Sequence, residues 1–198
     1  MVSEGAFRVL LIGGSSGTGK TTIAQQLAEF YGYSVVLVDD LRLAAQAIIS
    51  AEQHPDLHVF LRQGTTAYDS AEAYRDGLIT VAQVMLPAIR MVVDHHIAVD
   101  APIIIEGDGI LPQLITSGDK SRVQAVFLHE PDETIILNNM LRRRRGFEKA
   151  ERAQQRIQAH GSGLYGEWLK SKAEKQGVSV IDARPFETLL ERVKTAVI

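Results

Sequence analysis

The sequence predicts one α/β domain with a parallel sheet at its centre, and three observations support this prediction. Short runs of branched apolar residues alternate with segments of helical periodicity along the 198 residues, the pattern of a parallel sheet covered by helices. The first two runs and the helix between them lie within about 30 residues, the size of a βαβ unit. No internal repeat or linker-like segment interrupts the alternation, so residues 1–198 are predicted to form a single domain.

Five apolar runs are predicted to be strands, because each is rich in branched residues and ends at glycine or polar residues. They are residues 7–12, 34–38, 102–105, 123–128 and 178–181. Helices are predicted where apolar residues recur at helical spacing. These are residues 20–31, 41–51, 79–99, 134–159, 164–175 and a last helix from about residue 186. Pro87 is expected to kink or interrupt the helix of residues 79–99, and the Gly-Ser-Gly of residues 161–163 to separate two helices.

The composition is that of a soluble globular protein and excludes several classes of protein. Apolar residues make up 45% of the chain and charged residues 23%, so long disordered segments are not expected. The formal net charge of −3 argues against a nucleic-acid partner. Cysteine is absent from the sequence, which excludes a disulfide framework and a thiolate metal site. Because no apolar run suits a membrane span or a signal peptide, we expect a cytoplasmic protein without a membrane partner.

Residues 14–21, Gly-Ser-Ser-Gly-Thr-Gly-Lys-Thr, match the pattern G-x-x-x-x-G-K-[ST] between a predicted strand and a predicted helix. Such glycines let backbone N–H groups point inward as an anion-binding nest, and the helix adds its positive end. Lys20 is predicted to contact the β- and γ-phosphates of ATP, and Thr21 to ligate Mg²⁺. The residues expected to hold the nucleotide are Gly14, Ser15, Ser16, Gly17, Thr18, Gly19, Lys20, Thr21 and Thr22. The motif makes the predicted fold a P-loop NTPase with three α/β/α layers and a parallel five-stranded sheet.

Acidic residues follow the second predicted strand, where ligands bind in open parallel sheets. Asp39 is predicted to orient or accept the proton of an acceptor hydroxyl as it attacks the γ-phosphate. The alternative for Asp39 and Asp40 is a helix N-cap, so one can act in the reaction while the other caps. Arg42 is predicted to bind an anionic group of the acceptor, with a surface salt bridge as the alternative.

A second pair of carboxylates ends the third predicted strand. Glu106 and Asp108 are candidates for binding substrate, and Glu106 for assisting Mg²⁺ together with Thr21. The alternative is turn chemistry around Gly107 and Gly109.

Four consecutive arginines at residues 142–145 form the densest charge run. We predict a helical lid over residues 134–163 whose arginines stabilise the transition-state charge. Arg142 and Arg145 are the candidate catalytic pair, since they lie three apart on one helix face. The alternative is a solvated helix face or a nucleic-acid patch. Arg184, before Pro185, is predicted to line the adenine, with a proline-initiated helix as the alternative.

Three blocks of the sequence resemble 2-phosphoglycerate kinase: residues 12–21, residues 38–42 and residues 104–107. The first two blocks are also similar to chloramphenicol phosphotransferase, a likeness that implies a catalytic base at Asp39. In the order of its elements the chain resembles, more distantly, zeta toxins, shikimate kinase and gluconate kinase. The resemblance implies a small P-loop kinase that uses ATP and Mg²⁺.

The function predicted from these features is transfer of the γ-phosphoryl group of ATP to a hydroxyl of a small molecule. This acceptor is either neutral or anionic. The aperiodic segment of residues 52–78 is predicted to be an insertion that binds this acceptor. A nucleoside, nucleotide or polynucleotide kinase is an alternative. A nucleotide-dependent regulatory switch without a small acceptor is an alternative of another class.

Overall fold

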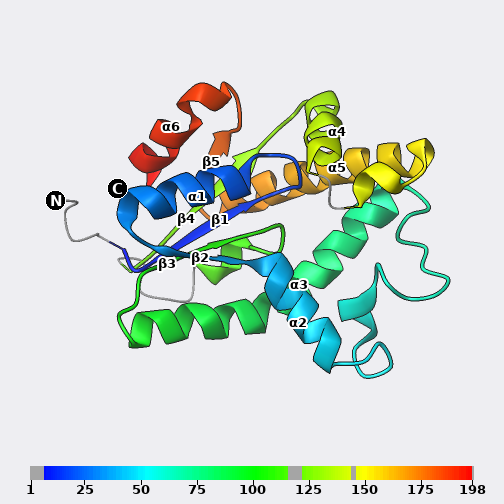
Figure 1. Cartoon of the computed structure of the whole chain (residues 1–198), viewed down its shortest axis with the longest axis horizontal. Coiled ribbons are helices and arrows are strands. Elements are labelled where there is room, and N and C mark those ends of the chain that lie inside the picture. Colours follow the sequence, from blue (N-terminus) through cyan, green and yellow to red (C-terminus); the bar gives the residue numbers. More distant parts are fainter. Residues whose placement is uncertain (1–6, 116–121, 144–145, 198) are drawn as a thin grey trace.

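The computed structural model describes residues 7–115, 122–143 and 146–197, and its centre is a sheet of five parallel strands (Figure 1). The strands are β1 (Val9–Gly14), β2 (Ser34–Leu37), β3 (Ile103–Glu106), β4 (Val123–His129) and β5 (Ser179–Asp182). Their order across the sheet is β2-β3-β1-β4-β5, and every neighbouring pair is parallel. The predicted five-stranded parallel sheet is therefore confirmed.

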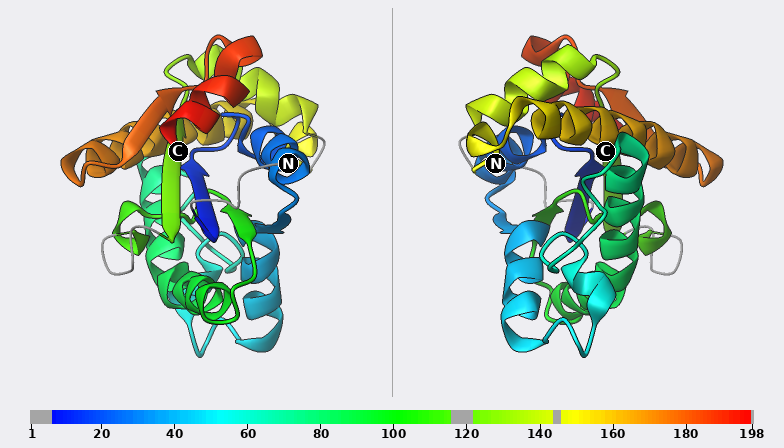
Figure 2. Two further views of the ribbon diagram at one scale, coloured as in Figure 1. Left: turned by 90° about the vertical axis from the view of Figure 1, so that its left-hand side faces the viewer. Right: turned by 90° about the vertical axis from the view of Figure 1, so that its right-hand side faces the viewer.

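Helices cover both faces of the sheet because side chains of successive strand residues point to opposite faces. Leu10 and Ile12 of β1 pack toward α1 (Lys20–Tyr31) and α6 (Leu189–Ala196). Val9 and Leu11 belong to the larger core under α3 (Ala71–Ala98) and α5 (Arg152–Lys175). The two views in Figure 2 show these helix layers on either side of the strands.

The helix α3 is longer than predicted, since it begins at Ala71 rather than at residue 79. The hydroxyl of Ser70 caps it by accepting a hydrogen bond from the backbone N–H of Ala73 at 3.1 Å. Pro87 lies inside α3, which continues past it, so the expected interruption is wrong. Packing explains this continuity: buried apolar residues follow one face of α3 on both sides of the proline. They are Val81, Ala82, Met85, Ile89 and Val93.

By length and mean hydropathy (1.5), α3 is the one helix in the described part of the chain that would suit a membrane span. Its apolar face is part of the core under the sheet, where Met85 and Ile89 are almost completely buried. The hydropathy of α3 is therefore accounted for by its position in this domain.

The predicted helix of residues 134–159 is two elements, and the predicted break at residues 161–163 does not exist. The helix α4 (Glu133–Arg142) and a 3₁₀ turn, η3 (Phe147–Lys149), precede α5, which runs without interruption through the glycines. A Cβ atom at Gly161 would lie 2.7 Å from the carbonyl oxygen of Ala71 and 2.8 Å from a ring carbon of Tyr74. Gly161 therefore serves the close approach of α5 to α3 and not a turn. The predicted lid corresponds to α4, η3 and the first turns of α5.

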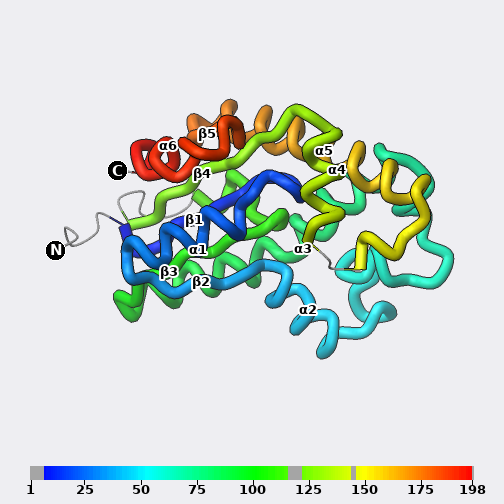
Figure 3. Tube along the Cα trace, turned by 45° about the horizontal axis from the view of Figure 1, so that its top comes forward, coloured from blue at the N-terminus to red at the C-terminus, as the bar shows by residue number. Residues whose placement is uncertain are grey.

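The predicted insertion is mostly a folded connection between α2 (Val38–Ile48) and α3. It contains the 3₁₀ turn η1 (Pro55–His58), and residues 71–78 already belong to α3. The Gln46 side chain donates a hydrogen bond to the carbonyl of Leu57 at 2.7 Å, which holds the connection against α2. Figure 3 shows α2 on one side of the carboxyl end of β1 and α4 on the other, and the connection continues from α2 to the neighbourhood of the start of α5. Two further 3₁₀ turns, η2 (Pro112–Leu114) and η4 (Phe186–Thr188), complete the described elements.

Candidate active site

The glycine loop between β1 and α1 has the curled backbone that the sequence predicts. Gly14, Gly17 and Gly19 have φ angles of 135°, 84° and 91°, a region that residues with a side chain rarely adopt. A Cβ atom at Gly14 would also lie 2.4 Å from the carbonyl oxygen of Leu128 on β4. Only glycine fits this position, and the loop is seated directly on the sheet.

Replacing Gly14 by alanine is expected to lower the free energy of unfolding by about 2–4 kcal/mol, because a backbone oxygen cannot move aside as a side chain can. Gly32→Ala is the matched control: φ there is +71°, and nothing lies within 4 Å of the added Cβ. Its expected cost is about 1 kcal/mol, that of the left-handed backbone alone. Urea unfolding measures both variants, and equal losses would contradict the packing role of Gly14.

Lys20 lies inside the curl of the loop, with only 3% of its surface exposed. Its Nζ atom donates hydrogen bonds to the carbonyl of Ser15 at 2.8 Å and to Oδ1 of Asp108 at 2.6 Å. The Ser16 hydroxyl donates to Oδ2 of the same carboxylate at 2.7 Å. Burial would raise the pKa of Asp108, but the Lys20 ammonium and these hydrogen bonds outweigh it and hold the pKa below its usual value. Because an ammonium has three donors, one N–H of Lys20 is left for a ligand.

The next residue, Thr21, faces a different carboxylate. Its hydroxyl donates a hydrogen bond to Oε1 of Glu106 at 2.7 Å, and Glu106 is buried at the end of β3. A hydroxyl and a carboxylate oxygen at this distance are the hard ligands that Mg²⁺ prefers, with phosphate oxygens and waters completing the shell. The donor set of Thr21 and Glu106 therefore fits this metal, whereas Asp108 is already bound to Lys20 and Ser16.

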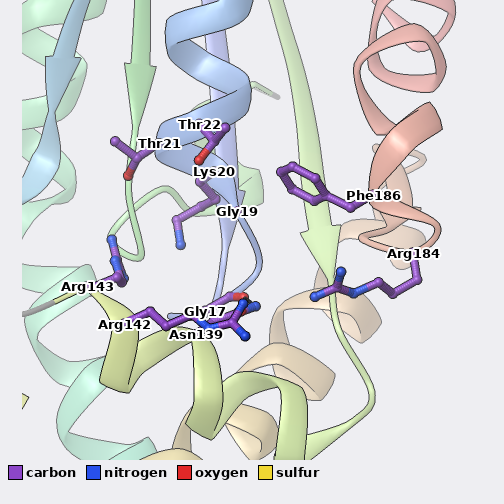
Figure 4. Close-up of a pocket in the computed structure, with 10 residues that line it drawn as sticks. All are labelled: Gly17, Gly19, Lys20, Thr21, Thr22, Asn139, Arg142, Arg143, Arg184 and Phe186. Atoms are coloured by element: carbon purple, nitrogen blue, oxygen red, sulfur yellow. Dashed lines mark hydrogen bonds between the residues drawn. The ribbon is translucent and has the colours of Figure 1, made fainter. Parts of the chain in front are cut away.

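A first cavity of about 320 Å³ lies at the amino end of α1 (Figure 4). Arg142, the last residue of α4, and Arg143 after it border the cavity on one side, and Arg184 and Phe186 after β5 border it on the other. It is also lined by Gly17, Gly19, Lys20, Thr21, Thr22 and Asn139. The structure thus brings the predicted nucleotide residues Lys20, Thr21, Thr22 and Arg184 to one cavity.

Two contacts fix the walls of the first cavity. The Asn139 side chain donates a hydrogen bond to the carbonyl of Gly17 at 2.7 Å, which ties α4 to the glycine loop. Arg184 donates from Nε to the buried carboxylate of Glu130 at 2.9 Å. Each wall is therefore anchored to the sheet or to the loop.

Two further cavities, of about 540 and 330 Å³, lie on the other side of the glycine loop; we call them the second and third cavities. Both are lined by Ser16, Asp39, Arg42 and Gln158. Arg143 lines both the first and the second cavity, so it lies between them. A group bound in the first cavity and one bound beside Asp39 would meet at Arg143.

Asp39 lies in the first turn of α2, because β2 ends one residue earlier than predicted, at Leu37. Its side chain is 45% exposed and accepts a hydrogen bond from Arg42 at 3.2 Å. The salt bridge that was the alternative role for Arg42 is therefore present in the structure. Arg42 also lines the second and third cavities. The N-cap alternative for Asp39 and Asp40 is wrong, because Leu37 is the N-cap residue. Asp40 is exposed and borders the second cavity.

The prediction of lid arginines names Arg142, which borders the first cavity, and Arg145, which lies outside the described residues. It misses Arg143, since the end of α4 decides which arginines of the run face the cavities. Asn139, Phe186 and Gln158 were also missed. They carry no motif, and only the packing of α4, η4 and α5 around the loop brings them to the site.

The parallel sheet, the glycine loop after β1 and the helices around its cavities give this protein the P-loop kinase fold. A sugar kinase from Janibacter sp. HTCC2649 has the same fold, with a TM-score of 0.53 and 23% identity over 96% of this chain and 94% of that chain. Shikimate kinase from Acinetobacter baumannii, in complex with shikimate, superposes with a TM-score of 0.51 and 15% identity, over 96% and 94% of the two chains.

Among curated proteins, the chain is similar to the 2-phosphoglycerate kinase of Methanocaldococcus jannaschii, with 24% identity over 208 residues. The match covers 96% of this chain and 65% of that relative, and the chain spans 65% or less of the length of the curated relatives it matches. No protein-family model matches the chain. The predicted resemblance to 2-phosphoglycerate kinase is thus confirmed as a similarity of sequence.

Proposed function

We propose that this protein is a small-molecule kinase that binds MgATP in the first cavity and transfers its γ-phosphoryl group to a hydroxyl in the second or third cavity. The observation that carries this proposal is that Arg143 lines two cavities, one at the glycine loop and one beside Asp39. A protein that only bound or hydrolysed nucleotide would not need a second cavity beside the glycine loop.

The chain's own residues would bind the nucleotide in a simple division of roles. Backbone N–H groups of the glycine loop would hold the α- and β-phosphates, and the free N–H of Lys20 would reach the γ-phosphate. Arg184 and Phe186 both line this cavity, with the guanidinium carbon of Arg184 5.9 Å from the ring centroid of Phe186, and a purine ring could stack against either side chain. This keeps Arg184 as a candidate for the adenine site.

Thr21 and Glu106 would hold Mg²⁺, Thr21 directly and Glu106 directly or through water. When bound, the metal supplies positive charge that neutralises the phosphate oxygens. Asp108 would not bind the metal. Its contacts with Lys20 and Ser16 would instead hold the ammonium group of Lys20 in position.

In the transfer step, the acceptor would be bound in the second or third cavity. The acceptor hydroxyl would give its proton to the carboxylate of Asp39 while its oxygen bonds to the γ-phosphorus. The bond from that phosphorus to the bridging oxygen would break, and the ADP formed would remain in the first cavity until it is released to solvent. Arg143, with Arg142 beside it, would stabilise the charge on the transferring group. Arg42 would keep Asp39 oriented through their hydrogen bond.

The test is the release of ADP from MgATP with a panel of hydroxyl compounds, followed by mass analysis of the product. The relatives' name suggests 2-phosphoglycerate as one member of the panel. We expect at least one small acceptor to stimulate ADP release more than tenfold over water. Nucleotide binding without stimulation by any small acceptor would support a regulatory switch instead, and stimulation by oligonucleotides alone would support a polynucleotide kinase.

Glu106→Gln is expected to raise the Mg²⁺ concentration that gives half-maximal activity by about 10–100-fold, since it weakens a ligand of the metal or of its water shell. Titration of the activity with Mg²⁺ at constant ATP measures this. Glu29→Gln, an exposed position on α1, is the matched control and is expected to leave the titration unchanged. An unaltered Mg²⁺ requirement in the Glu106 variant would remove Glu106 from the metal site.

A further inference from the structure

We infer that the third cavity selects an acceptor with a flat or apolar ring and at most one negative charge, so that phosphorylated acids are poor substrates. This inference rests on the proposed function, because it describes what the same kinase site accepts. Three features of the cavity carry it: an aromatic wall, polar groups without internal partners, and a balance of charge close to neutral.

Three aromatic rings form one wall of the third cavity. Phe60 contacts Tyr74 and Tyr68 with ring centroids 5.1 and 5.6 Å apart, and the two tyrosines are 5.8 Å apart. The lining also includes the apolar side chains of Val81 and Met85, which lie on α3 like Tyr74. Such a surface binds an apolar or aromatic ring face well, and it offers few favourable contacts to an open-chain polar acid.

The aromatic wall is held in place by glycines where neighbouring elements come closest. A Cβ atom at Gly77 would lie 2.8 Å from the ring of Phe60, and one at Gly161 would lie 2.8 Å from the ring of Tyr74. The loop that carries Tyr68 is closed by the Thr65 hydroxyl, which donates to the carbonyl of Val59 at 2.6 Å. The wall is therefore a built part of the fold and needs no rearrangement to present the rings.

The polar groups of the wall are free to bind a ligand. Within the described residues, the hydroxyls of Tyr68 and Tyr74 and the amide of Gln158 form no hydrogen bond. Burial raises the pKa of both tyrosines, so each phenol keeps its proton and can donate it in a hydrogen bond. A ring that carries hydroxyl or carbonyl groups would satisfy them.

The charges of the third cavity nearly cancel. Among the described residues that line it, Arg42 is the one cation, and it already contacts Asp39. Asp108 is neutralised by Lys20. A phosphate monoester carries about −1.5 to −2 charges at pH 7, and sites for it are built from several arginines, lysines or backbone N–H groups. Arg42 suffices for one carboxylate at most.

The inference is tested with wild-type protein, MgATP and acceptors in three groups. Ring compounds with at most one charge are pyridoxine, thymidine and shikimate. Open-chain compounds without phosphate are glycerol and gluconate, and the phosphorylated acid is 2-phosphoglycerate. We expect a ring compound to have a kcat/KM at least tenfold above that of every compound in the other two groups.

The wall itself is tested by Tyr68→Leu, with Tyr68→Phe as the variant that keeps the ring. Loss of the stacking surface in Tyr68→Leu is expected to raise the KM of the ring acceptor about tenfold, while the KM for ATP stays unchanged. Tyr68→Phe is expected to change the acceptor KM less than threefold. Phe30→Leu, on the far surface of α1, makes a similar exchange away from all three cavities and is expected to have no effect.

The outcomes separate this inference from the proposed function. Fastest transfer to 2-phosphoglycerate would overturn the inference and confirm the kinase. Equal acceptor KM values in Tyr68→Leu and wild type would also overturn it, since the rings would then not contact the substrate. Failure of every acceptor despite normal MgATP binding would count against the kinase itself, and the inference would fall with it.

Discussion

Lys20→Ala is expected to lower kcat/KM for phosphoryl transfer by at least about 10²–10³-fold, the loss typical of one group that stabilises transition-state charge. Lys20 is buried inside the glycine loop, and in the proposed mechanism its remaining N–H would contact the γ-phosphate. Steady-state turnover with the best acceptor measures this loss.

The substitution also leaves the carboxylate of Asp108 without its ammonium partner, which can destabilise the loop. The double variant Lys20→Ala/Asp108→Asn removes that charge, and circular dichroism checks the fold of both variants. Lys175→Ala, at the exposed end of α5, is the matched control and is expected to retain full activity. Folded Lys20 variants with turnover within tenfold of wild type would refute the role given to Lys20.

Asp39→Asn is expected to lower kcat by about 10²–10⁴-fold while the affinity for MgATP stays unchanged, because an amide of the same shape cannot take the hydroxyl proton. Asp39 lies on α2 with its carboxylate exposed to the second and third cavities, away from the first. The loss should therefore fall on the chemical step and leave nucleotide binding intact. Single-turnover transfer and nucleotide titration measure the two quantities separately.

Asp40→Asn is the neighbouring control for this prediction. Its carboxylate is exposed and borders the second cavity only, so we expect less than a fivefold change in kcat. If Asp40→Asn were the more damaging of the two, the base would have to be reassigned. Wild-type kcat in Asp39→Asn would show that no carboxylate at this position is needed.

The strands and the glycine loop could be predicted from sequence because their signals are local. Runs such as that of residues 103–105 are apolar without alternation, as expected of strands buried on both faces. The glycines of the loop mark positive φ angles directly, and the structure has them at Gly14, Gly17 and Gly19. Glu106 and Asp39 could be placed near the loop since the carboxyl ends of parallel strands share one edge.

The features that escaped prediction depend on contacts between distant segments. Lys20 meets Asp108 across more than 80 positions of sequence, and no motif in the sequence marks this contact. Glycine usually disfavours a helix, yet Gly161 lies inside α5, where its lack of a side chain allows the close contact with Tyr74. The aromatic wall joins residues of the α2–α3 connection and of α3, and no periodicity marks it.

The central claim, that the glycine loop binds the phosphate chain of a nucleotide, is tested most directly by calorimetric titration of the wild-type protein with ATP, ADP and AMP in the presence of Mg²⁺. Because the proposed site holds the β-phosphate through the loop N–H groups and the γ-phosphate through Lys20, ATP and ADP are predicted to bind at least tenfold more tightly than AMP. Absence of binding heat for all three nucleotides, or equal affinities for ATP and AMP, would contradict the account.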